Sequence, residues 1–208
     1  AWRPVDLYGL LFHILANGPA HRVFVPLAED TTRLNWSSGE DLVRVPEAVR
    51  GNEKVQRPLL EALAGPYMGT NHRRGYTYTW ITGHLADAHG RIAPRSLLLA
   101  LRKAAEITDE KYPEHDYPLH YEAIKRGVAE ASNTRVQELS GEDYPWVTPL
   151  LKGLRDMTVP LGIDELQKQW PQSVLKNVLA ASGDKLPPRR FASAPAAGRD
   201  IEHLIDDL

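Results

Sequence analysis

Apolar side chains recur at helical spacing along most of this chain of 208 residues, and glycine or proline ends several of the repeats. The first repeat stops at Asn17-Gly18-Pro19, a sequence typical of a helix C-terminus. Its apolar members are Leu7, Leu10, Leu11, Ile14 and Leu15. A second repeat occupies residues 53–63 and stops at Gly65-Pro66. Because this spacing matches one face of an α-helix, the sequence predicts a mainly α fold with little β structure.

Later parts of the chain extend this pattern, with two exceptions. Further helices are expected at residues 81–88, 94–107 and 121–139. Residues 22–26 favour a short strand, as does the segment in which Tyr76, Tyr78 and Trp80 alternate with other residues. Residues 28–44 mix charged, Thr, Ser and Gly side chains, which predicts irregular structure.

A domain boundary is expected near residues 140–144, between a multi-helix region (1–140) and a smaller module (141–208). Short helices are expected in this module at residues 147–157, 163–170, 174–181 and 201–208. Three short helices, the first of them opened by Pro160, resemble a helix-turn-helix or winged-helix module. Residues 185–190 and 192–198 are expected to form a flexible connection. Because the chain starts without Met and still has a helical pattern at its last residues, we expect a piece of a longer protein.

Composition excludes several classes of function. The chain has no cysteine, which rules out disulfides, thiolate catalysis, thiolate zinc sites and iron–sulfur clusters within these residues. The formal net charge is −2, so the total charge gives no reason to expect a nucleic acid or an anionic membrane as partner. The longest apolar runs, such as Leu97 to Leu101, are far shorter than a membrane span. We therefore expect a cytoplasmic protein with no membrane partner.

The segment Gly90-Arg91-Ile92-Ala93-Pro94-Arg95-Ser96 combines a helix start with two arginines. Proline suits a first helical turn because it lacks an N–H donor and its φ is preset, so Arg95 is expected on the first turn. Such a terminus attracts anions through its N–H groups and dipole, and a guanidinium strengthens a contact with phosphate. The alternative is that Arg91 and Arg95 pair with nearby carboxylates and only stabilise the helix start.

No catalytic motif accompanies this helix start. The chain lacks the Gly-x-x-x-x-Gly-Lys-Ser/Thr phosphate loop, Gly-x-Gly-x-x-Gly and the Gly-x-Ser-x-Gly nucleophile elbow. His84, Asp87 and His89 do not form a metal-binding pattern, because on a helix His89 points away from the face that His84 and Asp87 share. We therefore assign no catalytic residue, metal or cofactor to this chain, although a free-standing enzyme with dispersed catalytic residues remains an alternative.

Residues 71–80 form a second candidate site. Two arginines stand just before three aromatic residues, a mixture that binds nucleic acids through phosphate contacts and base stacking. The residues concerned are Arg73, Arg74, Tyr76, Tyr78 and Trp80. The alternative is an exposed turn followed by buried aromatics, and we favour it because such stretches are common in globular loops. A nucleic acid is accordingly not the favoured partner.

The run from His84 to Leu101, which contains Pro94-Arg95, resembles the lid segment of AAA+ and STAND-type P-loop ATPases. In that family a Pro-Arg pair at the start of a lid helix carries the arginine that reaches the nucleotide phosphates. The resemblance implies that Arg95 senses the nucleotide and that Arg91 assists it. Residues 159–208 are similar to the degenerate winged helix that often follows such a lid in large bacterial ATPases, including those of defence systems.

The family's Walker A and Walker B motifs are absent from these residues, so ATP and Mg²⁺ would require a core upstream of them. The resemblance therefore implies a non-catalytic regulatory and interaction region of a bacterial P-loop ATPase. Its expected partner is the ATPase core or another protein subunit. The alternative function is a nucleic-acid-binding module that uses residues 71–80.

Overall fold

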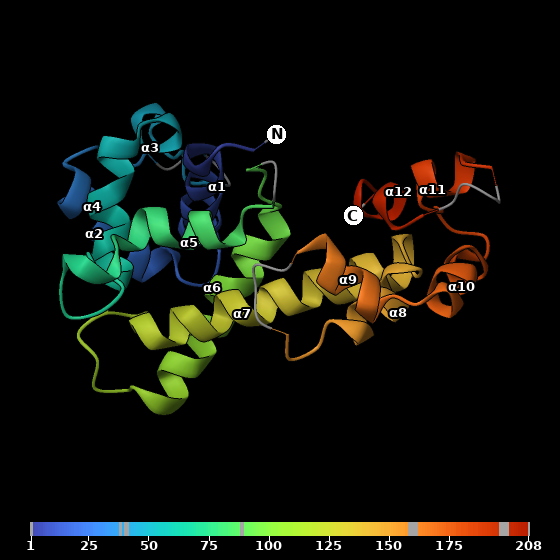
Figure 1. Ribbon diagram of the computed structural model, residues 1–208. Coiled ribbons are helices and arrows are strands. Elements are labelled where there is room, and N and C mark those ends of the chain that lie inside the picture. The colour runs from blue at the N-terminus through green and yellow to red at the C-terminus, as the bar shows by residue number, and fades with distance from the viewer. Residues whose placement is uncertain are drawn as a thin grey trace. The chain divides into compact units, whose positions relative to one another are not determined.

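A computed structural model of the chain describes residues 2–37, 39, 42–87, 90–157, 162–195 and 200–207. The described residues form helices joined by turns and irregular segments (Figure 1). An isolated antiparallel bridge joins Tyr67 to Tyr76, and the described ranges contain no sheet. The predicted mainly α fold with little β structure is therefore confirmed.

The chain divides into two compact units, Ala1–Asn133 and Thr134–Leu208. The first unit contains α1 (Pro4–Asn17), α2 (His21–Thr32), α3 (Glu47–Gly51), α4 (Glu53–Ala64), the 3₁₀-helix η1 (His72–Arg74), α5 (Thr77–Leu85), α6 (Pro94–Lys111) and most of α7 (Tyr121–Glu138). The second contains the π-helix η2 (Leu139–Asp143), α8 (Val147–Gly153), α9 (Ile163–Gln169), α10 (Gln172–Ser182), α11 (Arg189–Ser193) and α12 (Ile201–Ile205). The division lies within α7, earlier in the chain than the boundary expected after residue 140.

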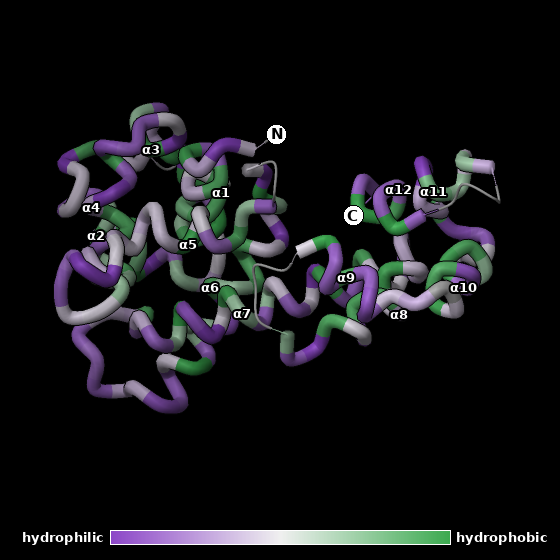
Figure 2. Tube along the Cα trace, in the orientation of Figure 1, coloured by the Kyte–Doolittle hydropathy of each residue, from purple (hydrophilic) through white to green (hydrophobic). Residues whose placement is uncertain are grey.

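Helix α1 lies in the middle of the first unit, against α2, α3, α4 and α6 (Figure 1). Leu7 and Leu11, two of the apolar residues expected on one face, are buried, and Tyr8 and Phe12 share that face at helical spacing. Ile14, also expected on this face, is exposed. The helix ends at Asn17, before Gly18, as expected. Figure 2 shows the same alternation of hydrophobic and hydrophilic residues along most of the helices. Burial of one face of each helix therefore builds this core.

Two segments expected as strands are helices instead. Residues 22–26 belong to α2, whose buried residues Phe24 and Ala28 stand four positions apart and so lie on one helical face. Helix α2 continues to Thr32, so the irregular segment expected from residue 28 begins later. Of the alternating aromatics, Tyr78 and Trp80 lie in the first turn of α5, and Tyr76 precedes the helix as its N-cap. In both segments, packing against other helices overrides the strand preference of valine, tyrosine and tryptophan.

Helices α6 and α7 approach each other closely at Gly127. A β-carbon at residue 127 would overlap the carbonyl oxygen of Ala100 in α6 and lie 3.1 Å from the Ala104 amide nitrogen. The ion pair between Lys103 and Glu130, at 3.5 Å, also joins these two helices. The missing side chain of glycine is therefore what permits this crossing.

The second unit has its own hydrophobic core, built from short helices. Two indole N–H groups tie its segments together: Trp146 donates to the carbonyl of Leu186, and Trp170 donates to that of Leu150, each at 3.0 Å. The other buried residues of this core are Leu175, Val178, Phe191, Ile201 and Leu204. The helices expected in this unit are present as α8, α9, α10 and α12, with somewhat shorter bounds for most of them.

The expectation of a flexible connection between α10 and α12 is wrong for part of this segment. Residues 189–193 form α11, and Phe191 is buried in the core of this unit. The carboxylate of Asp207 accepts hydrogen bonds from the amides of Arg190 and Phe191, at 3.0 and 2.9 Å. These contacts fix the segment. Residues 196–199 and Pro160 lie outside the described residues.

Alanine substitutions at two helical glycines test the crossing of α6 and α7. We expect Gly127→Ala to lower the free energy of unfolding by about 1–3 kcal/mol, because the new methyl group forces the helices apart. Gly83→Ala is the matched control, since residue 83 also lies in a helix but faces open space. It should raise the free energy of unfolding by about 0.5–1 kcal/mol through helix propensity. Urea unfolding measures the free energy of unfolding of each variant. Equal changes for Gly127→Ala and Gly83→Ala would contradict the close approach of α6 and α7.

Candidate functional site

Residues 66–77 form a closed loop between α4 and α5. The bridge between Tyr67 and Tyr76 joins its two ends. Two backbone hydrogen bonds continue this pairing: Met68 N–H donates to Gly75 O at 2.9 Å, and Thr77 N–H donates to Pro66 O at 3.1 Å. Met68 is fully buried and anchors the loop in the core. The tip of the loop is therefore held in one conformation.

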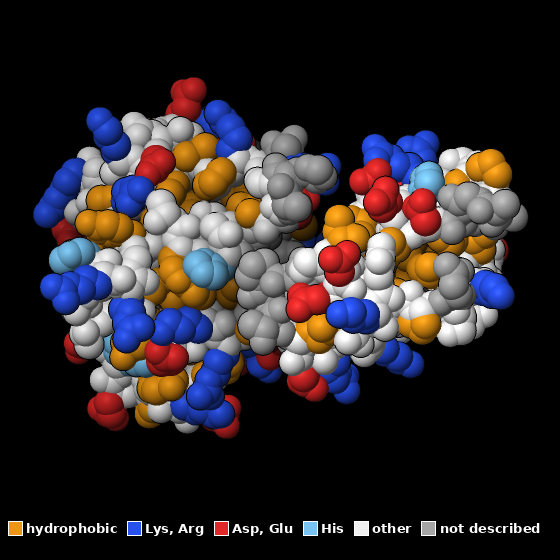
Figure 3. Space-filling model, in the orientation of Figure 1, with side chains coloured by type: hydrophobic (Ala, Val, Ile, Leu, Met, Phe, Trp, Pro, Cys, Tyr) orange, Lys and Arg blue, Asp and Glu red, His pale blue; other side chains and the backbone are white. Residues whose placement is uncertain are grey.

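The tip is the helical turn η1, and it presents two exposed arginines. The side-chain oxygen of Asn71 accepts from the Arg73 amide at 3.0 Å and so caps the turn. Gly75, with φ of 96°, ends it. Within the described part of the chain, no carboxylate pairs with Arg73 or Arg74. Figure 3 shows basic side chains on the side of this unit where the loop lies, with acidic side chains above and below them.

A stacked aromatic pair lies next to this turn. The ring of Trp80 packs against Gly75, where a β-carbon would lie 3.2 Å from Trp80 Cδ1. The imidazole of His84 stacks on Trp80 with ring centroids 3.8 Å apart and an interplanar angle of 20°. His84 Nδ1 lies 2.8 Å from the carbonyl oxygen of Trp80, so this nitrogen carries the proton. Trp80 is half-buried, whereas His84 is exposed.

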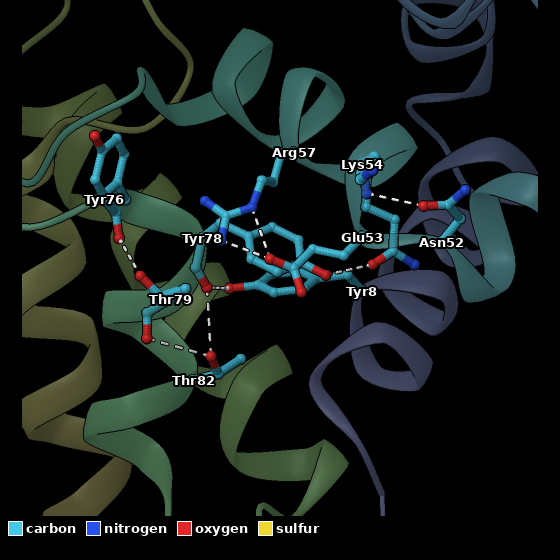
Figure 4. Close-up of polar contacts among 10 residues, drawn as sticks. Tyr8, Asn52, Glu53, Lys54, Arg57, Tyr76, Tyr78, Thr79 and Thr82 are labelled. Atoms are coloured by element: carbon cyan, nitrogen blue, oxygen red, sulfur yellow. Dashed lines mark hydrogen bonds and ion pairs between the residues drawn. The ribbon is translucent and has the colours of Figure 1, made fainter.

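Of the three aromatic residues expected in a nucleic-acid site, Tyr78 does not belong there. It is 2% exposed, and its hydroxyl donates to Gln56 Oε1 at 2.6 Å. Its carbonyl oxygen accepts from the Tyr8 hydroxyl at 2.6 Å and from Thr82 Oγ1 at 3.3 Å (Figure 4). Burial raises the pKa of the Tyr78 hydroxyl well above its ordinary value. The residue therefore anchors α5 in the core.

Gln56 connects this network to two further helices. Its side-chain nitrogen donates to the carbonyl oxygens of Val5, at 2.8 Å, and Val49, at 2.6 Å. With its oxygen on Tyr78, every donor and acceptor group of this fully buried amide has a partner. The Arg57 guanidinium lies 5.0 Å from the centre of the Tyr78 ring and pairs with Glu53 at 2.5 Å (Figure 4). The network thus joins α1, α3, α4 and α5.

The start of α6 carries the other two candidate residues. Pro94 occupies the first turn of the helix, as expected, and Arg95 follows it with an exposed side chain. Arg91 is held by Asp87, whose carboxylate accepts from the Arg91 amide at 2.8 Å and from its Nε at 3.0 Å. Arg91 therefore pairs with a carboxylate, which is the alternative that the sequence left open for it. His89, which the metal pattern included, lies outside the described residues.

Two further features of this site were accessible from the sequence. No acidic residue occurs between Glu61 and Asp87, which marks the loop and α5 as a locally basic segment. His84 follows Trp80 by four positions, a spacing that brings two side chains together on a helix but not on a strand. Expecting a strand at residues 76–80 therefore hid the stacked pair.

A cluster of rings surrounds His120 at the start of α7. The imidazole lies between the rings of Tyr112 and Tyr121, at centroid distances of 3.8 and 4.2 Å, with His115 at 4.5 Å. His120 Nδ1 accepts from the Glu122 amide at 3.1 Å and so caps α7. Burial, followed by the neighbouring His115, lowers the pKa of His120. The neutral imidazole is the form that this cap requires.

Comparison with known proteins adds no assignment. No family model, no characterised protein and no solved structure matches the chain. Within the described residues, no three His, Asp or Glu side chains form a group that could hold a metal ion. None of the described helices is long and apolar enough to span a membrane.

Three substitutions test the buried network. Gln56→Leu leaves the Tyr78 hydroxyl and two carbonyl oxygens without this partner, so we expect a loss of about 3 kcal/mol or more in the free energy of unfolding. Tyr78→Phe leaves only the Gln56 oxygen unpaired and should cost about 1–3 kcal/mol. Tyr8→Phe should cost about 1 kcal/mol, since Thr82 still donates to the Tyr78 carbonyl. Urea unfolding measures the free energy of unfolding of each variant. A smaller loss of this free energy for Gln56→Leu than for Tyr78→Phe would contradict this account.

The cap at His120 predicts a pH dependence of stability. Because the pKa of His120 is lower in the folded chain than its ordinary value of about 6.5, the unfolded chain binds this proton more readily. We therefore expect the free energy of unfolding to decrease as the pH drops from about 7 to below the ordinary histidine pKa of about 6.5. His120→Asn keeps a capping oxygen but does not titrate, so it should make the fall shallower. Urea unfolding at several pH values measures this, and parallel curves for the two proteins would exclude His120 as a contributor.

Proposed function

We propose that this chain is a non-catalytic regulatory and interaction region that works with a bacterial-type P-loop ATPase core and responds to bound nucleotide through Arg95. The observation that carries the proposal is the start of α6. This helix of 18 residues begins with Pro94 and exposed Arg95, and no acidic residue lies in its first turn. A guanidinium beside the positive end of a helix dipole is an arrangement that a phosphate stabilises.

Two backbone hydrogen bonds just before α6 support this role. Asp87 N–H donates to the carbonyl of Arg91, and Gly90 N–H donates to that of Asp87, each at 2.9 Å. Gly90 has φ of 71°, which suits glycine. We assign the phosphate contact to Arg95 because it stands in the first turn of the helix, and a positioning role to Arg91, whose Nε donates to Asp87.

The resemblance to ATPase lids supplies the proposed mechanism. Contact between Arg95 and the nucleotide phosphates favours docking of the helical unit on the ATPase core, and loss of a phosphate releases it. The second unit would pass this change to a partner protein. The proposed helix-turn-helix or winged-helix-like module comprises the short helices from α9 to α12, and the described residues include no wing strand. A role in a defence system is part of the same proposal.

The test uses the full-length gene product that contains this chain. We expect Arg95→Ala to weaken nucleotide affinity or hydrolysis by about 5- to 150-fold, the usual range of coupling between sites, and Arg95→Lys to restore part of it. Arg102→Ala is the matched control, since it removes an arginine from the same helix that pairs with Glu106. A gene product without a P-loop, or equal hydrolysis by the Arg95→Ala and Arg102→Ala proteins, would overturn the proposal.

A further inference from the structure

We propose that the first unit also binds single-stranded nucleic acid on one surface, which we call the η1–α5 surface. Its residues are Arg73, Arg74, Tyr76, Trp80 and His84. This site is independent of Arg95 and of any ATPase core. Tyr78, one of the residues expected from the sequence, is excluded because it is buried.

Charge is the first observation that supports this proposal. The chain as a whole has a formal net charge of −2, but no acidic residue occurs between Glu61 and Asp87. Several other arginines of this unit have a carboxylate partner three or four residues away, such as Arg3 with Asp6. Arg73 and Arg74 have no such partner among the described residues, so their charge is available to an external anion.

Rigidity is the second observation. The bridge between Tyr67 and Tyr76, the two hydrogen bonds beside it and the Asn71 cap all fix the loop that carries the arginines. The side chain of Arg74 also lies over Gly69, where a β-carbon would meet Arg74 Cγ at 2.9 Å. A surface that is already ordered loses little conformational entropy on binding, which favours affinity.

Exposed rings are the third observation, and they select the class of ligand. Tyr76 is 48% exposed, and its ring packs against Tyr67, with ring centroids 5.4 Å apart. His84 is exposed and has the Trp80 ring behind it. Because Trp80 packs against Gly75, these rings lie beside the arginine turn.

Unpaired bases stack on such rings while the arginines hold the phosphates, which is how proteins bind single strands without reading their sequence. A duplex keeps its bases inside the helix and cannot use the rings in this way. An acidic peptide could pair with the arginines, but its Asp and Glu side chains carry no rings for the stack. The combination of unpaired arginines and exposed rings therefore favours a single strand.

The experiment measures binding of labelled oligo(dT) and oligo(U) to the whole chain by fluorescence anisotropy at about 50–200 mM salt. We expect binding that weakens with salt. The double variant Arg73→Ala/Arg74→Ala should reduce affinity at least tenfold and lower the slope of log K against log salt by about 1.4, since each phosphate contact with a single strand contributes about 0.7. The control Arg22→Ala/Arg102→Ala removes the same charge from α2 and α6 and should change affinity little.

Variants at His84 separate stacking from charge. His84→Ala should weaken binding several-fold without a change in salt slope, and His84→Phe should restore it. Circular dichroism confirms that each variant is folded. Absence of binding at the lowest salt, equal affinity for a duplex or a polyglutamate peptide, or an equal loss in the control variant would each overturn the proposal. None of these outcomes bears on the nucleotide role of Arg95, which the hydrolysis assay tests separately.

Discussion

The fully buried side-chain amide of Gln56 is the contact on which the first unit depends. An unpaired buried amide costs several kcal/mol, so its partners are constrained to stay where they are. These partners come from α1, α3 and α5, while Gln56 itself lies on α4. Apolar packing alone tolerates small shifts of one helix on another, whereas these directional bonds do not. The network therefore sets how the helices fit together.

The Gln56 network fixes the position of α5, and this position determines the η1–α5 surface. With Tyr78 fixed inward, helical geometry places Trp80 about 200° around the axis and His84 about 240° around it. The side chain of His84 is exposed there, whereas that of Trp80 is partly buried and packs against the core. The closed loop before α5 is tied to the same helix through Thr77 and Tyr76. A polar contact in the core thus determines which residues the outer face presents.

The sequence predicted the fold where a helix carries its own complete apolar face. This is true of α1, α4, α6 and α7, whose buried residues recur at the helical period. The sequence-based prediction failed where contacts with other segments determine the secondary structure. Helices α2 and α5 carry strand-favouring residues, and α11 is held by Asp207. Within the candidate site, the exposure of Arg73 and Arg74 followed from their polarity. The role of Tyr78 depended on Gln56, which is distant in sequence, so no local pattern revealed it.

Total charge was a poor guide to the charge of any one surface. The value of −2 arises because acidic and basic residues nearly balance, and many of them pair within a single helix, as Glu53 does with Arg57. Such pairs cancel locally and leave little field beyond a Debye length of about 10 Å at 0.1 M ionic strength. The residues outside these pairs determine what an approaching ligand meets. Because Arg73 and Arg74 lie in a segment without acidic residues, a near-neutral chain can still present a cationic surface there.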